Sequence, residues 1–506
     1  MRLLLSIVCT MWAAILLAGC GNTGSGFNGD GGADLDGTVI GDGGCFGFLC
    51  SDTGVAEDAG CVGLQCQQTC PSTSISGTVY DPAMINGLYN VFVYVPNAAL
   101  DPITDGPVCT QCQAPASGNP VVSATTDFQG HFTIPNAPVG ANIPLVLQLG
   151  KWRRHLTISN VASCVDNPQP DKTLRLPKKQ HETSPDDNIP LMAMTTGCDG
   201  AECFFQERVG IDPSEFTGSN GTGRVRIYKS TNDDGQTFPN VNSGALNANA
   251  LWNTTGEMMK YDIVFDACEC STYTRGTNGY ANFLKYVNAG GRAFTTHYYY
   301  NFFASSTQCF GDTTCNGQAP LPTVGAWEGN QFLATAEANC PNDSNYNELP
   351  LGGSCLNIDT AVPKGQAFAD WYKNNNGKLT VGGGEAKGYI GLTDIREDMG
   401  LLSSTLVTAG TATPWLYAHG SSTFPQNYDA YYFSFNTPVG TSSTNQCGRA
   451  IYSDVHLAEA PEGAFPGCCQ NPNSSDHAPN ELALEFLFFD LASCVQNDTQ
   501  PPIIPN

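Results

Sequence analysis

Positively charged side chains are scarce in this 506-residue chain. It contains 22 Lys and Arg residues against 47 Asp and Glu residues, which gives a formal net charge of −25. Proteins that bind nucleic acid need clustered Lys and Arg to neutralise phosphates, so nucleic acid is excluded as a partner. One basic and aromatic cluster occurs, Lys-Trp-Arg-Arg-His at residues 151–155. We interpret it either as a solvated strand end or as a contact to another domain or to a ligand.

Patterns typical of zinc sites are also rare, although cysteine is abundant. Cys109 and Cys112 form one Cys-x2-Cys, no second one follows, and no His pair stands at zinc spacing. The chain has 22 cysteines, and setting aside Cys9 and Cys20 near the N-terminus leaves twenty. Such a number is typical of an exported protein stabilised by disulfides. We predict that most of the twenty are paired, but the sequence does not determine which pairs form.

The chain begins with an apolar run. Arg2 precedes the apolar residues 3–17, which are too few to span a bilayer, and Ala18 and Gly19 are the small residues of a signal-peptidase site. Cys20 follows directly and resembles the acylated cysteine of bacterial lipoproteins. The resemblance implies a signal peptide over residues 1–19 and a lipid anchor on Cys20 that holds the protein to a membrane of the bacterial cell envelope, on its extracytoplasmic side. An ordinary secretory signal with a chance cysteine is the alternative.

Residues 20–72 have too few apolar side chains to build a core. They are rich in Gly and Asp, and their second half carries five cysteines: Cys45, Cys50, Cys61, Cys66 and Cys70. This composition predicts a flexible, disulfide-stapled tether between the lipid anchor and the folded protein.

The pattern of residues 73–165 predicts an all-β domain. Short β-branched and aromatic runs alternate with turn signals, at residues 74–80, 91–95, 128–134, 145–149 and 155–158. Regularly spaced strands without helical segments are typical of a β-sandwich.

Part of this region resembles the carboxypeptidase-regulatory-like, transthyretin-like domains. Residues 77–81 follow the G-x-V-x-D pattern that opens the first strand of that family, and residues 126–132 follow its T-D-x-x-G-x-F hairpin turn. The family does not itself catalyse, so the resemblance implies a domain that packs beside another domain or presents it. The polar, proline-bounded residues 166–187 are predicted to be a linker.

Residues 188–495 show a different architecture. Strand-like runs at residues 189–196, 224–228, 261–266 and 292–296 alternate with helical patterns at residues 201–209 and 280–287, the second of which stops at Gly290-Gly291. This alternation predicts an open parallel α/β sheet, flavodoxin-like or amidotransferase-like, with helices on both faces.

A long insertion is expected within this α/β domain, at about residues 302–412. It contains Cys309, Cys315, Cys340 and Cys355, and the first two are close enough in sequence to close a small loop. The insertion would act as a lid or a recognition surface, and residues 496–506 would form a tail.

The α/β region resembles the class I glutamine-amidotransferase-like fold, nearest to its trehalose-utilisation (ThuA-like) branch. The resemblance rests on YDIVFDACE, on YANFLKYVNAGGRAFTTHYYY and on CGRAIYSDVHLAEA. It implies a sharp strand-to-helix elbow at residues 296–298 and a late histidine, His456. The family's nucleophilic cysteine is replaced at the elbow by His297, which nearly eliminates amidotransferase activity. We interpret the nearby Cys268 and Cys270 as disulfide-bonded, and therefore as unable to attack a substrate.

Four residues form the candidate catalytic site: Asp266, Glu269, His297 and His456. They would converge at the carboxyl ends of parallel strands, where open α/β sheets bind ligands. Two histidines with one or two carboxylates could hold a divalent metal or act as an acid–base pair. The alternative is a degenerate site whose polar groups bond only to one another.

Two functions remain from this pattern. The one we favour from sequence is an anchored, non-catalytic binding or structural lipoprotein, because no complete catalytic set can be assembled. The alternative is a sugar-directed hydrolase or lyase of the ThuA-like type that uses the His and carboxylate site. Expected partners are the membrane, through the lipid anchor, and either carbohydrate or another surface protein. Aromatic residues at 298–303 and 428–433 could stack on sugar rings, but such clusters in strands usually belong to the core.

Overall fold

The structure is a computed structural model. It describes residues 61–197, 200–231, 245–269, 271–309, 312–327, 354–360, 362–375, 377, 379–381, 387–392, 399–417, 430–455 and 479–503. The predicted signal peptide, Cys20, Cys270 and His456 lie outside these residues. Residues 61–506 form one compact unit. No helix in the described ranges combines the length and apolarity needed to cross a bilayer.

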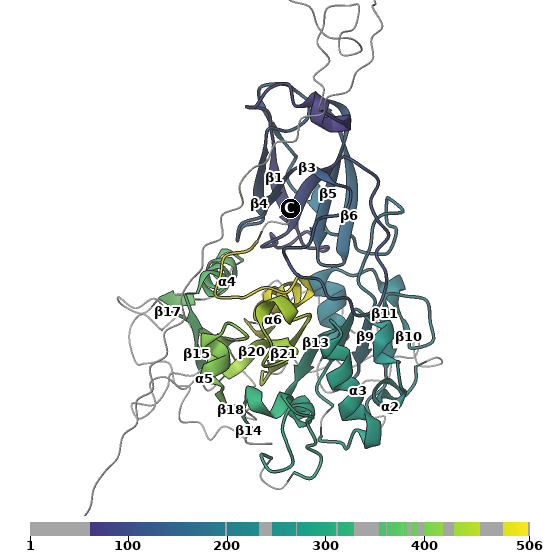
Figure 1. Ribbon diagram of the computed structural model, residues 1–506, viewed down its shortest axis with the longest axis vertical. Helices are drawn as coiled ribbons and strands as arrows, with labels where there is room; N and C mark the ends of the chain where they lie inside the picture. The colour runs from purple at the N-terminus through teal and green to yellow at the C-terminus, as the bar shows by residue number, and fades with distance from the viewer. Residues whose placement is uncertain are drawn as a thin grey trace, which may run out of the picture. The chain divides into compact units, whose positions relative to one another are not determined.

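The early part of the described chain forms two four-stranded sheets (Figure 1). The first contains β4 (His131–Pro135), β1 (Ser74–Tyr80), β7 (Asp166–Pro168) and β8 (Leu174–Arg175), and the second contains β3 (Pro120–Thr125), β2 (Phe92–Pro96), β5 (Gly140–Leu149) and β6 (Trp152–Val161). Side chains of β4 alternate between exposed and buried, as expected for a strand with one covered face. Its buried Phe132 and Ile134 join the same apolar cluster as Val93 and Leu145 of the second sheet. The two sheets therefore share one core.

The predicted linker, residues 166–187, contributes to the first sheet. β7 and β8 both pair in parallel with β1, with Ser74 opposite Asp166 and Val79 opposite Leu174. The side chain of Asp166 accepts hydrogen bonds from the hydroxyls of Ser74 and Ser76 at 2.6 and 2.7 Å. The polar composition of residues 166–187 predicts a linker. In the structure, polar groups of this segment are hydrogen-bonded to β1 instead.

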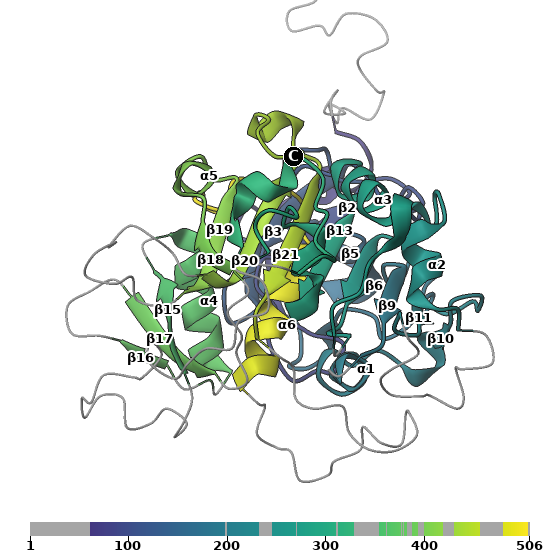
Figure 2. The ribbon, with the colours of Figure 1, turned by 90° about the horizontal axis from the view of Figure 1, so that it is seen from below.

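The later part of the chain builds one eleven-stranded sheet, whose strands lie side by side in Figure 2. In spatial order it contains β10 (Phe216–Gly218), β11 (Val225–Tyr228), β9 (Met192–Thr195), β12 (Ile263–Asp266), β13 (Arg292–Thr296), β21 (Gly448–Ser453), β20 (Ala430–Thr437), β19 (Ala412–Tyr417), β15 (Ser354–Asp359), β17 (Lys387–Leu392) and β16 (Leu379–Val381). The first six are parallel to one another, and every pairing from β20 onward is antiparallel. The sheet is therefore mixed, where the sequence predicted a parallel one. Within the predicted insertion, β15, β16 and β17 extend this sheet, and β14 (Gly325–Trp327) pairs with β18 (Met399–Leu402).

Helices cover both faces of this sheet. The helices are α1 (Ala201–Cys203), the π-helix η3 (Phe204–Val209), α2 (Ala248–Asn253), α3 (Gly276–Asn288), α4 (Pro363–Asn374), α5 (Ser404–Thr408) and α6 (Pro479–Ala492), with short 3-10 turns such as η6 (His297–Phe302). Phe265 and Phe294 face one core with α6 and η3, whereas Val264 and Ala293 face a second core with α2 and α3. α6 is apolar around its circumference and buried along its length, as expected of a helix enclosed by protein.

Disulfides join distant parts of the chain. The pairs formed between described cysteines are Cys61–Cys66, Cys70–Cys164, Cys109–Cys447, Cys112–Cys494 and Cys309–Cys315, and Cys203 is also disulfide-bonded. The small loop predicted between Cys309 and Cys315 is confirmed. Cys109 and Cys112 each bond to a cysteine more than 300 residues away, which excludes the zinc alternative for this motif.

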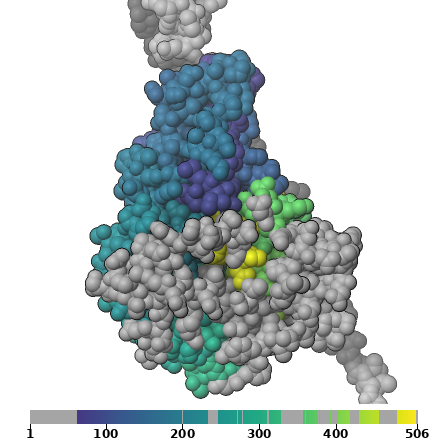
Figure 3. Space-filling view, turned by 180° about the vertical axis from the view of Figure 1, so that it is seen from behind, coloured from purple at the N-terminus to yellow at the C-terminus, as the bar shows by residue number. Residues whose placement is uncertain are grey.

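The basic cluster at residues 151–155 connects the early sheets to later segments. Lys151 bonds to Asp262 at 2.5 Å, and the buried Trp152 ring packs 5.6 Å from Phe489 of α6. Surface atoms of the later segments, green and yellow in Figure 3, lie against the purple and blue early part. Of the two interpretations open from the sequence, a contact to another part of the protein is therefore the correct one.

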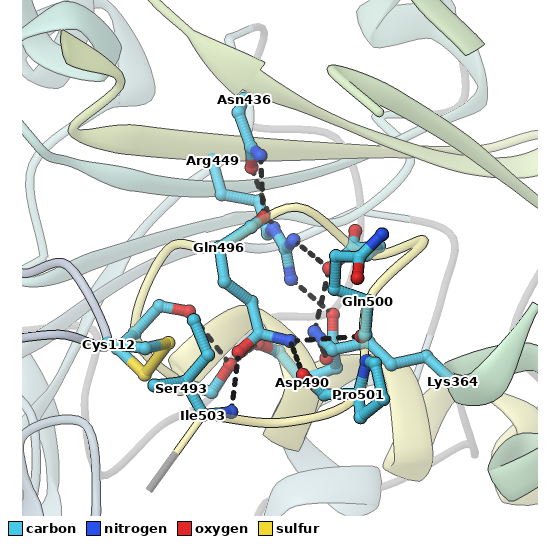
Figure 4. Close-up of a disulfide and its surroundings, with 12 residues drawn as sticks. Cys112, Lys364, Asn436, Arg449, Asp490, Ser493, Gln496, Gln500, Pro501 and Ile503 are labelled. Atoms are coloured by element: carbon cyan, nitrogen blue, oxygen red, sulfur yellow. Dashed lines mark hydrogen bonds and ion pairs between the residues drawn. A yellow bond between two sulfur atoms is a disulfide. The ribbon is translucent and has the colours of Figure 1, made fainter. Parts of the chain in front are cut away.

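A buried ion-pair network lies beside the Cys112–Cys494 disulfide (Figure 4). Arg449 of β21 and Lys364 of α4 each bond to Asp490 and Asp498, at 2.5 and 2.7 Å respectively. All four side chains are at most 5% exposed, and each charge has an opposite partner, as buried charges require. The C-terminal segment after α6 is held to the sheet by this network.

Candidate active site

The strand β13 ends in a sharp turn at the carboxyl edge of the sheet. Thr296 is extended, and the next residue, His297, has φ of 40° before the chain enters η6. A left-handed conformation is unfavourable for a residue with a Cβ atom, and such strain concentrates at functional sites. β13 lies directly beside β21, with Thr296 opposite Ser453. His456 follows β21 by three residues and lies outside the described chain, so its position relative to His297 stays a prediction.

Cys268 contacts the imidazole of His297. The distance from Sγ to Nδ1 is 3.3 Å, and the two residues are 0% and 1% exposed. Cys268 is not part of a disulfide, so our interpretation of it as disulfide-bonded is wrong. Its side chain is directed at an imidazole nitrogen that can accept the thiol proton, and Cys270 lies outside the described residues. The carboxyl edge therefore holds a thiol and an imidazole in hydrogen-bond contact.

Asp266, at the end of β12, is fully buried. Neither carboxyl oxygen has a hydrogen-bond partner among the described residues. Burial raises the pKa of Asp266 well above its usual range; Arg275 opposes this shift and the negative charge of Glu269 reinforces it. The raised pKa favours the protonated form of Asp266, which can donate a proton.

Unlike the carboxyl group of Asp266, that of Glu269 has several partners among the described residues. Its carboxylate forms an ion pair with Arg275, and both side chains are fully buried. The backbone N–H and the hydroxyl of Thr231 donate to Oε1 of Glu269 at 2.6 and 2.8 Å. The Arg275 guanidinium also lies 4.3 Å from the centroid of the Tyr299 ring, a cation–π contact. Glu269 is thus held by several contacts and positions Arg275 through their ion pair.

A tyrosine links the elbow to the neighbouring strand. The hydroxyl of Tyr452 lies 2.7 Å from the carbonyl oxygen of His297 and 2.8 Å from Oδ1 of the buried Asp454. The side chain of Asp454 is therefore directed at Tyr452. Within the described ranges, no group of three or more His, Cys, Asp or Glu side chains could hold a metal ion. The described part of the site therefore fits proton-transfer chemistry and does not by itself fit a metal.

Three contributors to this site were missed or misread in the sequence: the thiol of Cys268, Arg275 and Tyr299. Tyr299 lies 2.9 Å from the hydroxyl of Thr195 at the end of β9. An arginine six residues after an acidic residue carries no recognisable signal, because the intervening loop determines whether they meet. Cys268 did carry a recognisable signal, because it stands two residues after the end of the buried strand β12.

The aromatic residues around the elbow belong to the protein interior. Tyr299, Tyr300, Phe302 and Phe303 are each 0% exposed and belong to the core beneath α2 and α3. Tyr298 is half-buried. The described aromatic cluster is thus core packing and not an exposed platform for sugar rings.

Comparisons with known proteins find little. No known protein family matches the chain, and no curated protein does. A type II cohesin–X-dockerin complex from Acetivibrio cellulolyticus with an N-terminal interface mutation matches 30% of this chain and 78% of its own chain, at 11% identity and a TM-score of 0.15. A 9R-lipoxygenase from Cyanothece PCC8801 matches 24% of this chain and 19% of its own, at 17% identity and a TM-score of 0.14. Similarities this low support no statement about fold or function.

Proposed function

We propose that this protein is an exported, lipid-anchored envelope protein that acts as a sugar-directed hydrolase or lyase at the carboxyl edge of its large sheet. The observation that carries the proposal is the contact between Cys268 and His297, with the buried carboxyl of Asp266 at the same strand end as Cys268. A strained elbow, a buried thiol–imidazole pair and an unpartnered acid are costly features that a purely structural sheet edge does not need. The sugar-directed part rests on the resemblance to the trehalose-utilisation branch.

The sequence resemblances supply the architecture of the proposal. A carboxypeptidase-regulatory-like β-sandwich would precede a ThuA-like α/β domain and present it away from the membrane, with Cys20 as the anchor. The shared core of the two early sheets and the six parallel strands of the large sheet support this arrangement. The five described disulfides support export to an oxidising compartment.

The chemistry proposed for the site is proton transfer around a bound ligand. The imidazole of His297 would take a proton, and the carboxyl of Asp266, whose pKa is raised by burial, would give one. Glu269 would act as a positioning residue that holds Arg275 by their ion pair. His456, which follows β21 in the sequence, would be the fourth residue of the candidate catalytic site.

The test uses the detergent-solubilised full chain and a panel of 4-nitrophenyl α- and β-glycosides, with nitrophenolate release as the readout. At least one glycoside should be cleaved, and the rate should fall by about 100-fold or more in His297→Asn, because general acid–base groups contribute that much. His155→Asn is the matched control, since His155 pairs with Asp186 in the early sheets, at 2.9 Å. Cleavage that survives His297→Asn would contradict the proposal, as would a panel that is neither cleaved nor bound.

A second candidate is a non-catalytic binding or structural lipoprotein. The complete burial of Cys268, Asp266 and Glu269 favours it, because buried polar groups can also serve to fix a unique core. Binding of a panel sugar or of another surface protein without turnover would support this candidate. Stoichiometric divalent metal in the purified protein that is lost in His297→Ala would instead support the catalytic one.

A further inference from the structure

We infer that Cys268 is the nucleophile of this edge and that His297 is the group that accepts its proton. This inference rests on the proposed function and names the bond-forming atom. In the amidotransferase-like pattern the cysteine occupies the elbow. Here the elbow residue is the imidazole, and the thiol comes from just after the neighbouring strand β12.

The geometry of the pair supports proton transfer. The Sγ–Nδ1 distance of 3.3 Å is within hydrogen-bond range for sulfur, so a thiol proton can pass directly to the imidazole. The backbone of His297 is fixed by its own turn and by the Tyr452 hydroxyl, which lies 2.7 Å from its carbonyl oxygen. The backbone that carries the imidazole is therefore held by its own turn and by a contact from β21.

A separate observation indicates that a ligand belongs beside this pair. Asp266 comes from the same strand end as Cys268, is 0% exposed, and has two carboxyl oxygens without hydrogen-bond partners in the described chain. Its electrostatic neighbours are Glu269, Arg275 and Tyr299, all at the carboxyl edge. A buried carboxyl with no hydrogen-bond partner destabilises the folded protein unless another group satisfies it. A ligand group with a lone pair, such as a glycosidic oxygen, would accept its proton.

Cys268, His297, Asp266 and one water molecule are sufficient for the complete reaction. The thiol proton of Cys268 moves to Nδ1 of His297, and the sulfur bonds to an electrophilic carbon of the ligand, the anomeric carbon of a sugar. The bond from that carbon to the leaving oxygen breaks, and the oxygen keeps the electron pair and takes the carboxyl proton of Asp266. Water then attacks the same carbon, its hydroxyl stays on the carbon, and its second proton returns to Asp266. The carbon–sulfur bond breaks, and the sulfur recovers its proton from His297.

The test is the rate at which iodoacetamide modifies Cys268 in the folded, detergent-solubilised full chain, followed by peptide mass spectrometry without reduction. Iodoacetamide is small, which matters because the Cys268 side chain is 0% exposed. We expect Cys268 to be carbamidomethylated in the native protein, and the rate at pH 7 to fall by at least about tenfold in His297→Asn. His155→Asn should leave the rate unchanged. If a variant fails to fold, carbamidomethylation of Cys268 in the native wild type still tests the inference.

Two results would overturn the inference. One is modification of Cys268 only after unfolding in guanidinium. The other is an equal rate in the wild type and in His297→Asn. Turnover of the glycoside panel separates this inference from the proposed function. Activity that survives Cys268→Ser but not His297→Asn would refute the nucleophile while the proposed function stands. A reactive Cys268 in a protein that neither binds nor cleaves any glycoside would refute the proposed function while the thiol–imidazole pair stands.

Discussion

At the scale of single residues, His297 combines a chemical role with a backbone cost. Its φ of 40° lies in the left-handed region, where a side chain with a Cβ atom costs about 1 kcal/mol relative to glycine. We therefore expect His297→Gly to be more stable than His297→Ala by about that amount, although both remove the contact with Cys268. Urea denaturation of the two variants measures the difference. Equal stability would mean that the turn relaxes, and that the elbow stores no strain.

Cys20 is a second residue whose chemistry can be tested by itself. The small residues before it and the Gly- and Ser-rich residues after it are those of a lipoprotein. Cys20→Ser should release the protein from the membrane or leave an unprocessed precursor, because no thiol is present to accept the lipid. Membrane fractionation and the mass of the mature N-terminus provide the readout. Unchanged fractionation with the same N-terminus would exclude lipid anchoring.

The sequence was informative about which residues stand at strand ends and uninformative about their partners. Asp266 and His297 were placed at the carboxyl edge because each follows a buried strand, and both lie there. The state of Cys268 could not be predicted, since an even count of cysteines favours complete pairing and says nothing about one thiol directed at an imidazole. Arg275 required knowledge of the loop that brings it to Glu269.

At the scale of elements, β1 and α6 meet through two buried carboxyls. Asp81, directly after β1, accepts hydrogen bonds from the backbone N–H groups of Ile85 and Asn86, and the side-chain amide of Asn86 donates to Glu485 of α6 at 2.7 Å. Burial raises the pKa of Asp81 to about 6, and burial with the nearby Asp81 charge raises that of Glu485 well above its usual range. Arg208 of η3, which pairs with Glu481, is the nearest cation that opposes the Glu485 shift.

This pair predicts a loss of stability as pH rises. Both folded-state pKa values lie above the unfolded values of 3.8 and 4.5, so their contribution is fully present below about pH 4 and is lost as pH rises through 6 and beyond. The free energy of unfolding should fall between pH 5 and pH 8 by an amount on the order of 2 kcal/mol, and Glu485→Gln should remove the part of that fall that comes from Glu485 while the part from Asp81 remains. Glu481→Gln, on the same helix, is the matched control and should keep the slope. A pH-independent wild type would contradict the prediction.

Strands with a clear periodicity were predictable, and those that depend on distant partners were not. The predicted ranges 74–80 and 292–296 coincide with β1 and β13, because each is a short β-branched or apolar run bounded by turn residues. β3 was missed: its six residues are all half-buried, so no alternation marks them. β15 and β17 pair with each other, and β15 also contacts β19, so their place in the large sheet depends on contacts across more than fifty residues. Such pairing cannot be inferred from local pattern.

At the scale of the whole molecule, the early sheets and the later sheet are fastened together at several independent points. Two disulfides cross between them, and the indole of Trp371 in α4 donates to the carbonyl oxygen of Gly87 at 2.6 Å. The Tyr89 ring also stacks on Phe486 of α6, with centroids 5.9 Å apart. The apolar cluster of the early sheets continues into α6 without interruption. The early sheets and the later sheet are therefore joined both by disulfides and by a continuous apolar core.

The covalent part of this connection can be tested by cutting the chain between its two halves. A specific protease site inserted after Lys172, in the exposed turn between β7 and β8, leaves Cys109 and Cys112 on one fragment and Cys447 and Cys494 on the other. After cleavage the wild type should migrate as one band in denaturing gels without reductant and as two bands with it. The double variant Cys109→Ser/Cys112→Ser should give two bands in both cases, because these two bridges are the ones between described cysteines that join the fragments. Each of the two bridges spans well over 300 residues and should contribute ~2–4 kcal/mol by restricting the unfolded chain, so the uncleaved double variant should also unfold at lower urea concentration. Two bands from the unreduced, cleaved wild type would refute this pairing and, with it, the covalent connection between the early sheets and the later sheet.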